Sequence, residues 1–83
     1  MPMAVSISAA AKKAIEKLPA VVKVRVADRV ALLADYPAVS GVKALKGERK
    51  GEYRVRVGKY RIIFTVAGGV LTVVDVDNRK DVY

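Results

Sequence analysis

The chain has 83 residues, a formal net charge of +8 and 53% hydrophobic residues. This length leaves room for one small core, and the high apolar content excludes intrinsic disorder. The absence of Cys and His excludes disulfides, zinc fingers, thiol nucleophiles and His-based acid–base catalysis. We therefore predict a single domain over residues 1–83 with no metal or cofactor, whose chemistry depends on Arg, Lys, Tyr, Asp, Glu, Ser or Thr.

The sequence also bears on the cellular compartment. No apolar run approaches the roughly 18 residues that a membrane-spanning helix requires. The N-terminal stretch Met1–Lys17 lacks the charged segment and long apolar core of a signal peptide. We expect a cytoplasmic protein without a membrane partner.

Two helices are predicted in the first half of the chain. Residues Ala4–Ile7 alternate weakly and indicate a short strand, after which Ser8 is suited to cap a helix over Ala9–Lys17. The dipeptide Leu18-Pro19 ends that helix, and Pro19 is favourable as the first residue of a second helix that extends to Tyr36. The pattern therefore predicts a helical hairpin that covers a sheet.

The start of the second helix is ambiguous, because residues 21–26 alternate partly like a strand. The helical interpretation is favoured, since apolar residues keep helical spacing over a stretch longer than most strands. These residues are Val22, Val26, Val30 and Leu33.

Three strands are predicted in the second half, after a basic connecting loop over residues 37–51. Strict alternation predicts a strand over Glu52–Val57, and Gly58-Lys59 is typical of a two-residue hairpin turn. The next strand begins at Tyr60, with Tyr60, Ile62, Phe64 and Val66 toward the core and Arg61, Ile63 and Thr65 on the other face. After the turn Ala67-Gly68-Gly69, the apolar run Val70–Asp77 predicts a central third strand.

The tight hairpin fixes which residues face each other. With a two-residue turn, Val57 pairs with Tyr60, so that Arg56 lies opposite Arg61 and Arg54 opposite Ile63 on the non-core face. Opposed like charges destabilise a sheet, whereas an anion between them would reverse the sign. The alternative is a solvated basic face on which both side chains extend into water.

The third strand carries two acids whose orientation the sequence leaves open. A change of one residue in the loop moves Asp75 and Asp77 from one face of the sheet to the other. We interpret them as charge compensation for the neighbouring arginines. Residues 78–83 by themselves are typical of an ordinary tail.

The positive charge is concentrated in one part of the chain. Residues 43–61 hold eight of the 16 basic residues and two of the 8 acids, or +6 of the +8 net charge. Lys and Arg neutralise phosphates and release counterions, so this concentration predicts a polyanionic partner.

Two motifs carry a family resemblance. The run LKG-x3-GEYRVRVGKYRIIF over residues 45–64, with the closing RKDVY of residues 79–83, resembles the RelE/ParE toxin superfamily over nearly the whole chain. The helical hairpin that turns at Lys17-Leu18-Pro19 also fits. The resemblance implies an α+β fold in which an N-terminal helical hairpin packs on a small twisted, mostly antiparallel β-sheet, as in RelE-like proteins.

The resemblance also implies a function. RelE-like members are toxins of type II toxin–antitoxin systems that cleave mRNA in the ribosomal A site and inhibit translation. The reaction is attack of a ribose 2′-OH on the adjacent phosphodiester, which leaves a 2′,3′-cyclic phosphate and requires no metal. The implied partners are an acidic RelB-like antitoxin, the ribosome with its RNA, the mRNA, and operator DNA only through the antitoxin complex.

Site residues follow from matching the motifs to this sequence. The resemblance implies that Arg61 and Arg79 hold the scissile phosphate and that Tyr83 orients the base. The implied catalytic set is Arg56, Arg61, Arg79 and Tyr83, and the implied RNA- or phosphate-binding set is Lys46, Arg49, Lys50, Arg54, Lys59 and Lys80.

The sequence departs from the family pattern at the proton acceptor. Arg54 and Arg56 stand where some members have Lys, and Asn78 stands where many have His. Arginine binds phosphate well but does not act as a general base, so the base stays unassigned. Two alternatives remain open: a ParE-like inhibitor of DNA gyrase, and a noncatalytic module of the same fold that binds nucleic acid or antitoxin.

Overall fold

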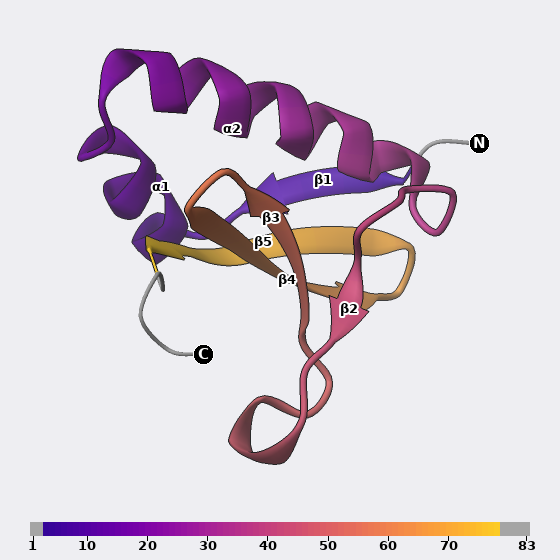
Figure 1. Ribbon diagram of the computed structural model, residues 1–83. Coiled ribbons are helices and arrows are strands. Elements are labelled where there is room, and N and C mark those ends of the chain that lie inside the picture. Colours follow the sequence, from indigo (N-terminus) through magenta and orange to yellow (C-terminus); the bar gives the residue numbers. More distant parts are fainter. Residues whose placement is uncertain (1–2, 79–83) are drawn as a thin grey trace.

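The structure is a computed structural model that describes residues 3–78, in which two helices lie on one face of a five-stranded sheet (Figure 1). The strand order is β1-β5-β4-β3-β2. The strands are β1 (Ala4–Ile7), β2 (Lys43–Ala44), β3 (Tyr53–Val57), β4 (Tyr60–Ala67) and β5 (Val70–Asn78). Because β1 pairs with β5 in parallel and every other pair is antiparallel, the predicted α+β class with a mostly antiparallel sheet is confirmed.

Local sequence signals explain where the helices begin. The side-chain oxygen of Ser8 accepts a hydrogen bond from the Ala11 backbone N–H at 3.1 Å, which caps α1 (Ala9–Glu16) as predicted. Pro19 precedes α2 (Ala20–Leu32) by one position instead of opening it. The helix prediction across residues 21–26 is confirmed. None of the helices between residues 3 and 78 is long and apolar enough to cross a membrane.

The end of the second predicted helix differs from the expectation. The α-helix stops at Leu32, and a 3-10 helix, η1 (Leu33–Asp35), follows with Tyr36 as its C-cap. Leu33 is fully buried and belongs to the core, as its helical spacing from Val26 and Val30 predicts.

The segment predicted as a loop over residues 37–51 contains two short elements. Strand β2 pairs with β3 through Lys43 opposite Arg54 and Ala44 opposite Tyr53, and the 3-10 turn η2 (Gly47–Arg49) follows. The connection between β2 and β3 extends away from the rest of the sheet (Figure 1). A two-residue strand has no detectable alternation, so only its pairing with β3 defines it.

The core lies between the helices and the sheet. Phe64 is fully buried there, and its ring lies 5.8 Å from Tyr36 and 5.7 Å from Tyr53, centroid to centroid. The buried core residues are Ala11, Val26, Val30 and Leu33 from the helical segments and Val55, Ile62, Phe64, Leu71, Val73 and Val76 from the sheet. Partial burial raises the pKa of the Tyr36 phenol above its ordinary value, and the neighbouring Tyr53 raises it further.

Candidate nucleic-acid interface

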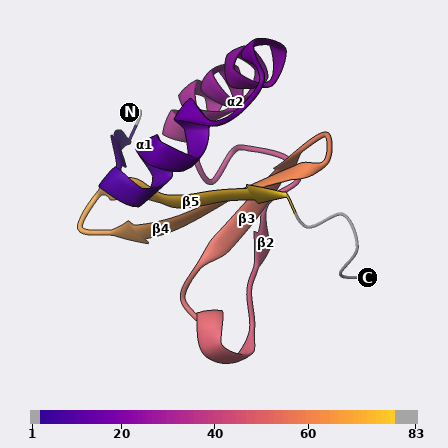
Figure 2. The same cartoon turned by 90° about the vertical axis from the view of Figure 1, so that its left-hand side faces the viewer.

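The sheet has a face opposite the helices, which we call the open face (Figure 2). Charged residues on this face form two rows that run across the strands. The first row is Arg56, Arg61 and Asp77, and the second is Lys43, Arg54 and Asp75, with the apolar Ile63 between Arg54 and Asp75. Each row has its basic residues toward the β2–β3 side and ends in an aspartate on β5.

The first row confirms the predicted register of the hairpin. Arg56 pairs with Arg61, and Gly58 adopts a φ of 58° in the turn between them. Arg61 also pairs across the ladder with Asp77, whose carboxylate accepts hydrogen bonds from Nε at 3.0 Å and from a terminal Nη at 3.2 Å. The opposed arginines therefore do not require a bound anion, because the chain itself supplies the Asp77 carboxylate to Arg61.

A β-bulge places the aspartates on the open face. The pairing of β4 with β5 shifts between Ile63, opposite Asp75, and Phe64, opposite Val73. Val73 and Val76 therefore both enter the core, although uninterrupted alternation would put them on opposite faces. The orientation that the sequence left open is thus resolved, and Asp77 does compensate the charge of Arg61.

The second row surrounds a buried apolar side chain. Ile63 is fully buried, although it lies on the open face and belongs to no part of the helix-covered core. Its neighbours in register are Arg54 and Asp75. The expected orientation of Ile63 was right, and its burial shows that the open face excludes solvent at its centre.

The connection between β2 and β3 contributes further basic residues. Arg49 donates to Glu52 at 2.8 Å and lies 3.9 Å from Asp75 on β5. Lys46 and Lys50 are exposed on the same connection. Three of the predicted phosphate-binding residues, Lys46, Arg49 and Lys50, therefore lie together, and Arg49 is tied to the sheet through carboxylates.

Lys59 lies apart from the two rows. It lines a groove of about 310 Å³ between α2 and the β3–β4 turn, together with Val22 and Arg25 from the helix and Val57 and Tyr60 from the strands. The structure therefore places this predicted phosphate-binding residue beside α2.

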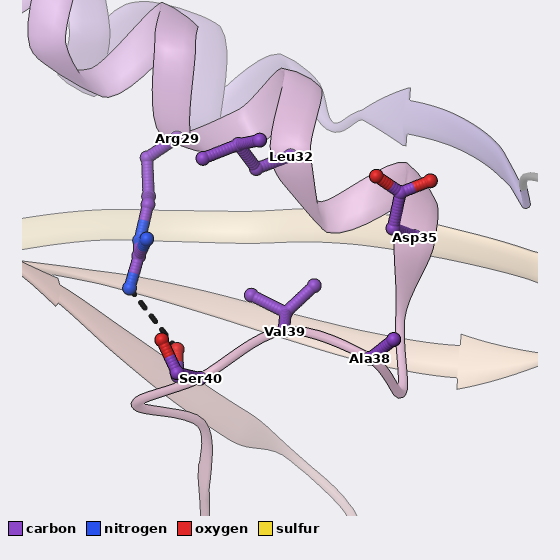
Figure 3. Close-up of a pocket in the computed structure, with 6 residues that line it drawn as sticks. All are labelled: Arg29, Leu32, Asp35, Ala38, Val39 and Ser40. Atoms are coloured by element: carbon purple, nitrogen blue, oxygen red, sulfur yellow. Dashed lines mark hydrogen bonds between the residues drawn. The ribbon is translucent and has the colours of Figure 1, made fainter.

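A second pocket, of about 170 Å³, lies between α2 and the loop that follows η1 (Figure 3). Arg29 donates from a terminal Nη to the Ser40 backbone oxygen at 3.0 Å, and Leu32 and Val39 form part of the wall. None of the residues that line this pocket belongs to the two charged rows.

Three predicted site residues, Arg79, Lys80 and Tyr83, lie outside the described residues. Within residues 3–78 there is no group of three or more acidic, His or Cys side chains that could hold a metal ion. The structure thus places Arg54, Arg56 and Arg61 on one face, near the β2–β3 connection that carries Arg49. The described side chains include no metal site.

Two members of the rows were not among the predicted site residues, although Asp77 was correctly interpreted as charge compensation for a neighbouring arginine. Lys43 was grouped only with the general positive charge, but β2 places it opposite Arg54. Asp77 could have been paired with Arg61 only if the bulge had been anticipated. The alternation of the run VLTVVDVD changes phase at its double valine, which is the one available signal of that bulge.

Comparison with known proteins identifies the class of this fold. The RelBE2 toxin–antitoxin complex from Mycobacterium tuberculosis contains a chain with a TM-score of 0.84 and 24% identity, covering 95% of this chain and 100% of that chain. A chain of the archaeal RelE–RelB complex from Pyrococcus horikoshii gives a TM-score of 0.80 and 25% identity, with 100% of both chains covered. The isolated E. coli RelE toxin gives 0.76 and 21%, covering 98% of this chain and 90% of that chain. The fold is therefore that of the RelE-like toxins.

The family follows from the sequence itself. The model of a family described as the ParE toxin of the type II toxin–antitoxin system parDE matches residues 5–83. The chain therefore belongs to this family, within the RelE/ParE toxin superfamily, and is a toxin of a type II toxin–antitoxin system. No curated protein matches the chain.

Proposed function

We propose that this toxin is a ribosome-dependent endoribonuclease that cleaves mRNA in the A site and thereby inhibits translation in the cytoplasm. The observation that carries the proposal is the register of the open face, where Arg56 lies opposite Arg61 and Arg54 opposite Ile63 in the next row. Guanidinium groups bind phosphate oxygens in a planar, two-bond geometry, and three of them share one face of two adjacent strands.

The proposed reaction is attack of a ribose 2′-OH on the adjacent phosphodiester. A new bond forms between the 2′ oxygen and phosphorus, the bond to the 5′ oxygen breaks, and the products carry a 2′,3′-cyclic phosphate and a 5′-OH. Negative charge develops on the phosphate oxygens in this step, so fixed cations stabilise the transition state more than the ground state. Arg56 and Arg61 are assigned this role, with Arg79 completing the set.

The proton of the 2′-OH requires a different group. Arginine stays protonated near neutral pH, and the sequence has no His. Asp77 is engaged by Arg61 in two hydrogen bonds. The acceptor is therefore sought in Tyr83 or in a group of the ribosome or mRNA, and Tyr83 is also assigned to orient the base.

The β2–β3 connection supports a contact with ribosomal RNA. Its basic residues Lys46, Arg49 and Lys50 are exposed, and the connection that carries them extends away from the sheet (Figure 1). Contacts between basic side chains and RNA phosphates weaken as the salt concentration rises, because salt cations compete for the phosphates. Binding to the ribosome is expected to depend strongly on ionic strength.

An acidic RelB-like antitoxin is the proposed protein partner. Two of the similar structures are RelB–RelE complexes by their descriptions. In this chain, Val21 is 70% exposed, Val24 61% and Leu32 50%, so that α2 presents an apolar surface to solvent. The chain as a whole is strongly basic, with a net charge of +8. An acidic amphipathic segment would cover both features, and operator DNA would be bound through that complex.

Cleavage on the ribosome tests the proposal. Purified protein is added to programmed ribosomes with a vacant A site, and cleavage is mapped by primer extension, with the chemistry of the product ends determined. We expect cuts at the A-site codon and a 2′,3′-cyclic phosphate on the upstream fragment. Free mRNA without ribosomes is the control, and intact mRNA on vacant ribosomes would falsify the proposal.

A second candidate, inhibition of DNA gyrase, is favoured by one observation, because the matching family model is that of ParE. Gyrase-dependent supercoiling with purified toxin separates the two candidates, because only a ParE-like activity reduces it.

A further inference from the structure

The pairing of Arg61 with Asp77 depends on a bulge that the chain stabilises with side chains. Ser8 at the start of α1 donates from its hydroxyl to the backbone oxygen of Val74 at 3.2 Å. Asp75 accepts a hydrogen bond from the Val76 backbone N–H at 2.8 Å. Two backbone groups at the irregularity, the Val74 oxygen and the Val76 N–H, thus have side-chain partners, which stabilise the bulge.

This bulge brings Asp77 directly opposite Arg61. The two hydrogen bonds, at 3.0 and 3.2 Å, come from Nε and one terminal nitrogen, so they fix the plane of the guanidinium as well as its position. The Arg61 side chain is 11% exposed and that of Asp77 is 23% exposed. Little solvent screens this pair, in contrast to the surface pair of Arg49 and Glu52.

Arg61 requires such an anchor because of its other neighbour in the row. Arg56 lies opposite it on β3, and two guanidinium groups in register repel each other. A carboxylate on the β5 side attracts Arg61 and offsets that repulsion. Asp77 uses two of the five N–H donors of a guanidinium, so its contact does not by itself exhaust the capacity of Arg61.

The geometry points to Asp77 as a positioning residue that holds the Arg61 guanidinium in the orientation required for phosphate binding beside Arg56. This inference rests on the proposed nuclease function and deepens it, because it explains how two opposed arginines act at one phosphate. Asp77 does not itself contact the RNA. Its effect is on the orientation of Arg61, and hence on the rate of cleavage more than on the binding of the ribosome.

The opposite role for Asp77 makes a contrary prediction. A carboxylate that merely competes with phosphate for Arg61 would restrain the toxin, and its removal would strengthen RNA binding and accelerate cleavage. A positioning carboxylate, once removed, leaves binding nearly unchanged and slows cleavage. The direction of the change in rate therefore distinguishes the two roles.

The test is Asp77→Asn, which preserves the shape of the side chain and removes its charge. Single-turnover cleavage on vacant-A-site ribosomes is measured as a function of ribosome concentration. We expect the rate at saturation to fall by about 10- to 100-fold, the scale expected for a misplaced catalytic group, with half-saturation changed by less than about twofold. Asp77→Glu, which keeps the charge, is expected to recover part of the lost rate.

Asp28→Asn is the matched control, since it changes the net charge equally on exposed α2, away from the open face. It is expected to cleave like wild type. Thermal unfolding of every variant is the check on folding, and each variant is expected to be as fully folded as the wild type at the assay temperature. Wild-type rates in a folded Asp77→Asn variant, or faster cleavage with tighter binding, would overturn the inference, as would an equal loss in Asp28→Asn.

A spectroscopic measurement tests the orientation of Arg61 independently of catalysis. The side-chain Nε–H signal of Arg61, assigned through its loss in Arg61→Lys, is expected to exchange slowly with solvent in the wild type. It should shift and exchange faster in Asp77→Asn but not in Asp28→Asn. An unchanged signal in Asp77→Asn would show that Asp77 does not fix Arg61.

The proposed nuclease function and the positioning role of Asp77 can be overturned separately. A wild-type toxin that leaves mRNA intact on the ribosome overturns the proposed function, and with it the use of Arg61 in cleavage. The NMR comparison still decides whether Asp77 orients Arg61 in that case. An active wild type with an equally active Asp77→Asn variant overturns the inference alone.

Discussion

The two faces of the sheet are built in different ways. The helix-covered face buries aromatic and aliphatic side chains around Phe64, and none of the buried side chains described between residues 3 and 78 is charged. The open face alternates with it along the same strands and carries two charged rows that end in aspartates. The helix-covered face thus stabilises the fold by packing, whereas on the open face the pairing of the same strands places charged side chains opposite each other.

This difference implies that stability and activity can be separated by substitution. Changes on the covered face should lower the free energy of unfolding, because they leave cavities in a close-packed interior. Changes to exposed cations on the open face should affect activity with little effect on unfolding. Ile63 is an exception, because it lies on the open face and is fully buried.

The largest expected effect on stability is that of Phe64→Ala. Loss of the ring removes its contacts with Tyr36 and Tyr53 and is expected to destabilise the fold by about 3–5 kcal/mol. Denaturant unfolding measures the change. Val70→Ala, at a site that is 38% exposed, is the control and should change stability much less. Equal effects from the two variants would contradict the position of the core.

On the open face, Arg56→Ala should reduce cleavage without unfolding the protein. Loss of one fixed cation beside a developing negative charge is expected to lower the rate by about 10²- to 10³-fold. The melting temperature should stay near that of wild type, because Arg56 is exposed. Arg25→Ala, which removes the same charge from the exposed surface of α2, should leave the cleavage rate unchanged. A similar loss in both variants would indicate a general charge effect.

Ser8→Ala should have a smaller effect on stability, and it should also alter the bulge that positions Asp77 on the open face. It removes the cap of α1 and the hydrogen bond to Val74 at the bulge, with an expected loss of about 0.5–2 kcal/mol. Thermal unfolding gives this value, and the Arg61 Nε–H signal reports any change at the bulge. Ser6→Ala, at an exposed position on β1, is the control. A neutral Ser8→Ala variant would show that neither bond contributes to stability.

The smallest effect on stability is expected for Val24→Asp on the outer surface of α2. An exposed substitution should change unfolding by no more than about 0.5 kcal/mol. Affinity for an acidic antitoxin should nevertheless fall by about tenfold or more, a change of about 1.4 kcal/mol, measured by calorimetry. Val24→Lys is the matched variant, since it removes the same apolar group with the opposite charge. Unchanged affinity in both would place the antitoxin elsewhere.

Much of the fold could be predicted from local patterns. Ser8, Pro19 and the alternation of Glu52–Val57 gave the positions of both helices and of the hairpin, and Gly58-Lys59 gave its register. Strand β2 could not be predicted, because two residues carry no periodic signal. Ile63 could be assigned to the correct face, but its burial depends on neighbours from other strands.

Of the candidate site, only the arrangement of the arginines could be predicted from the sequence. The opposition of Arg56 and Arg61 follows from the length of one turn, which is a local property. The presence of a carboxylate at Arg61 does not, because it depends on whether β5 carries a bulge before Asp77. Sequence reasoning had attributed the balancing charge to a bound anion, although it also anticipated compensation by the acids.

By itself, the amino-acid sequence determined the composition of the molecule, the type of its main elements, the pairing of the central hairpin and the concentration of positive charge. These depend on residues close together in the chain. The tertiary structure decided that β2 joins the sheet, that Ile63 is buried and that Asp77 meets Arg61. Each of these depends on the register between strands joined by separate turns, and a single bulge changes which side chains share a face.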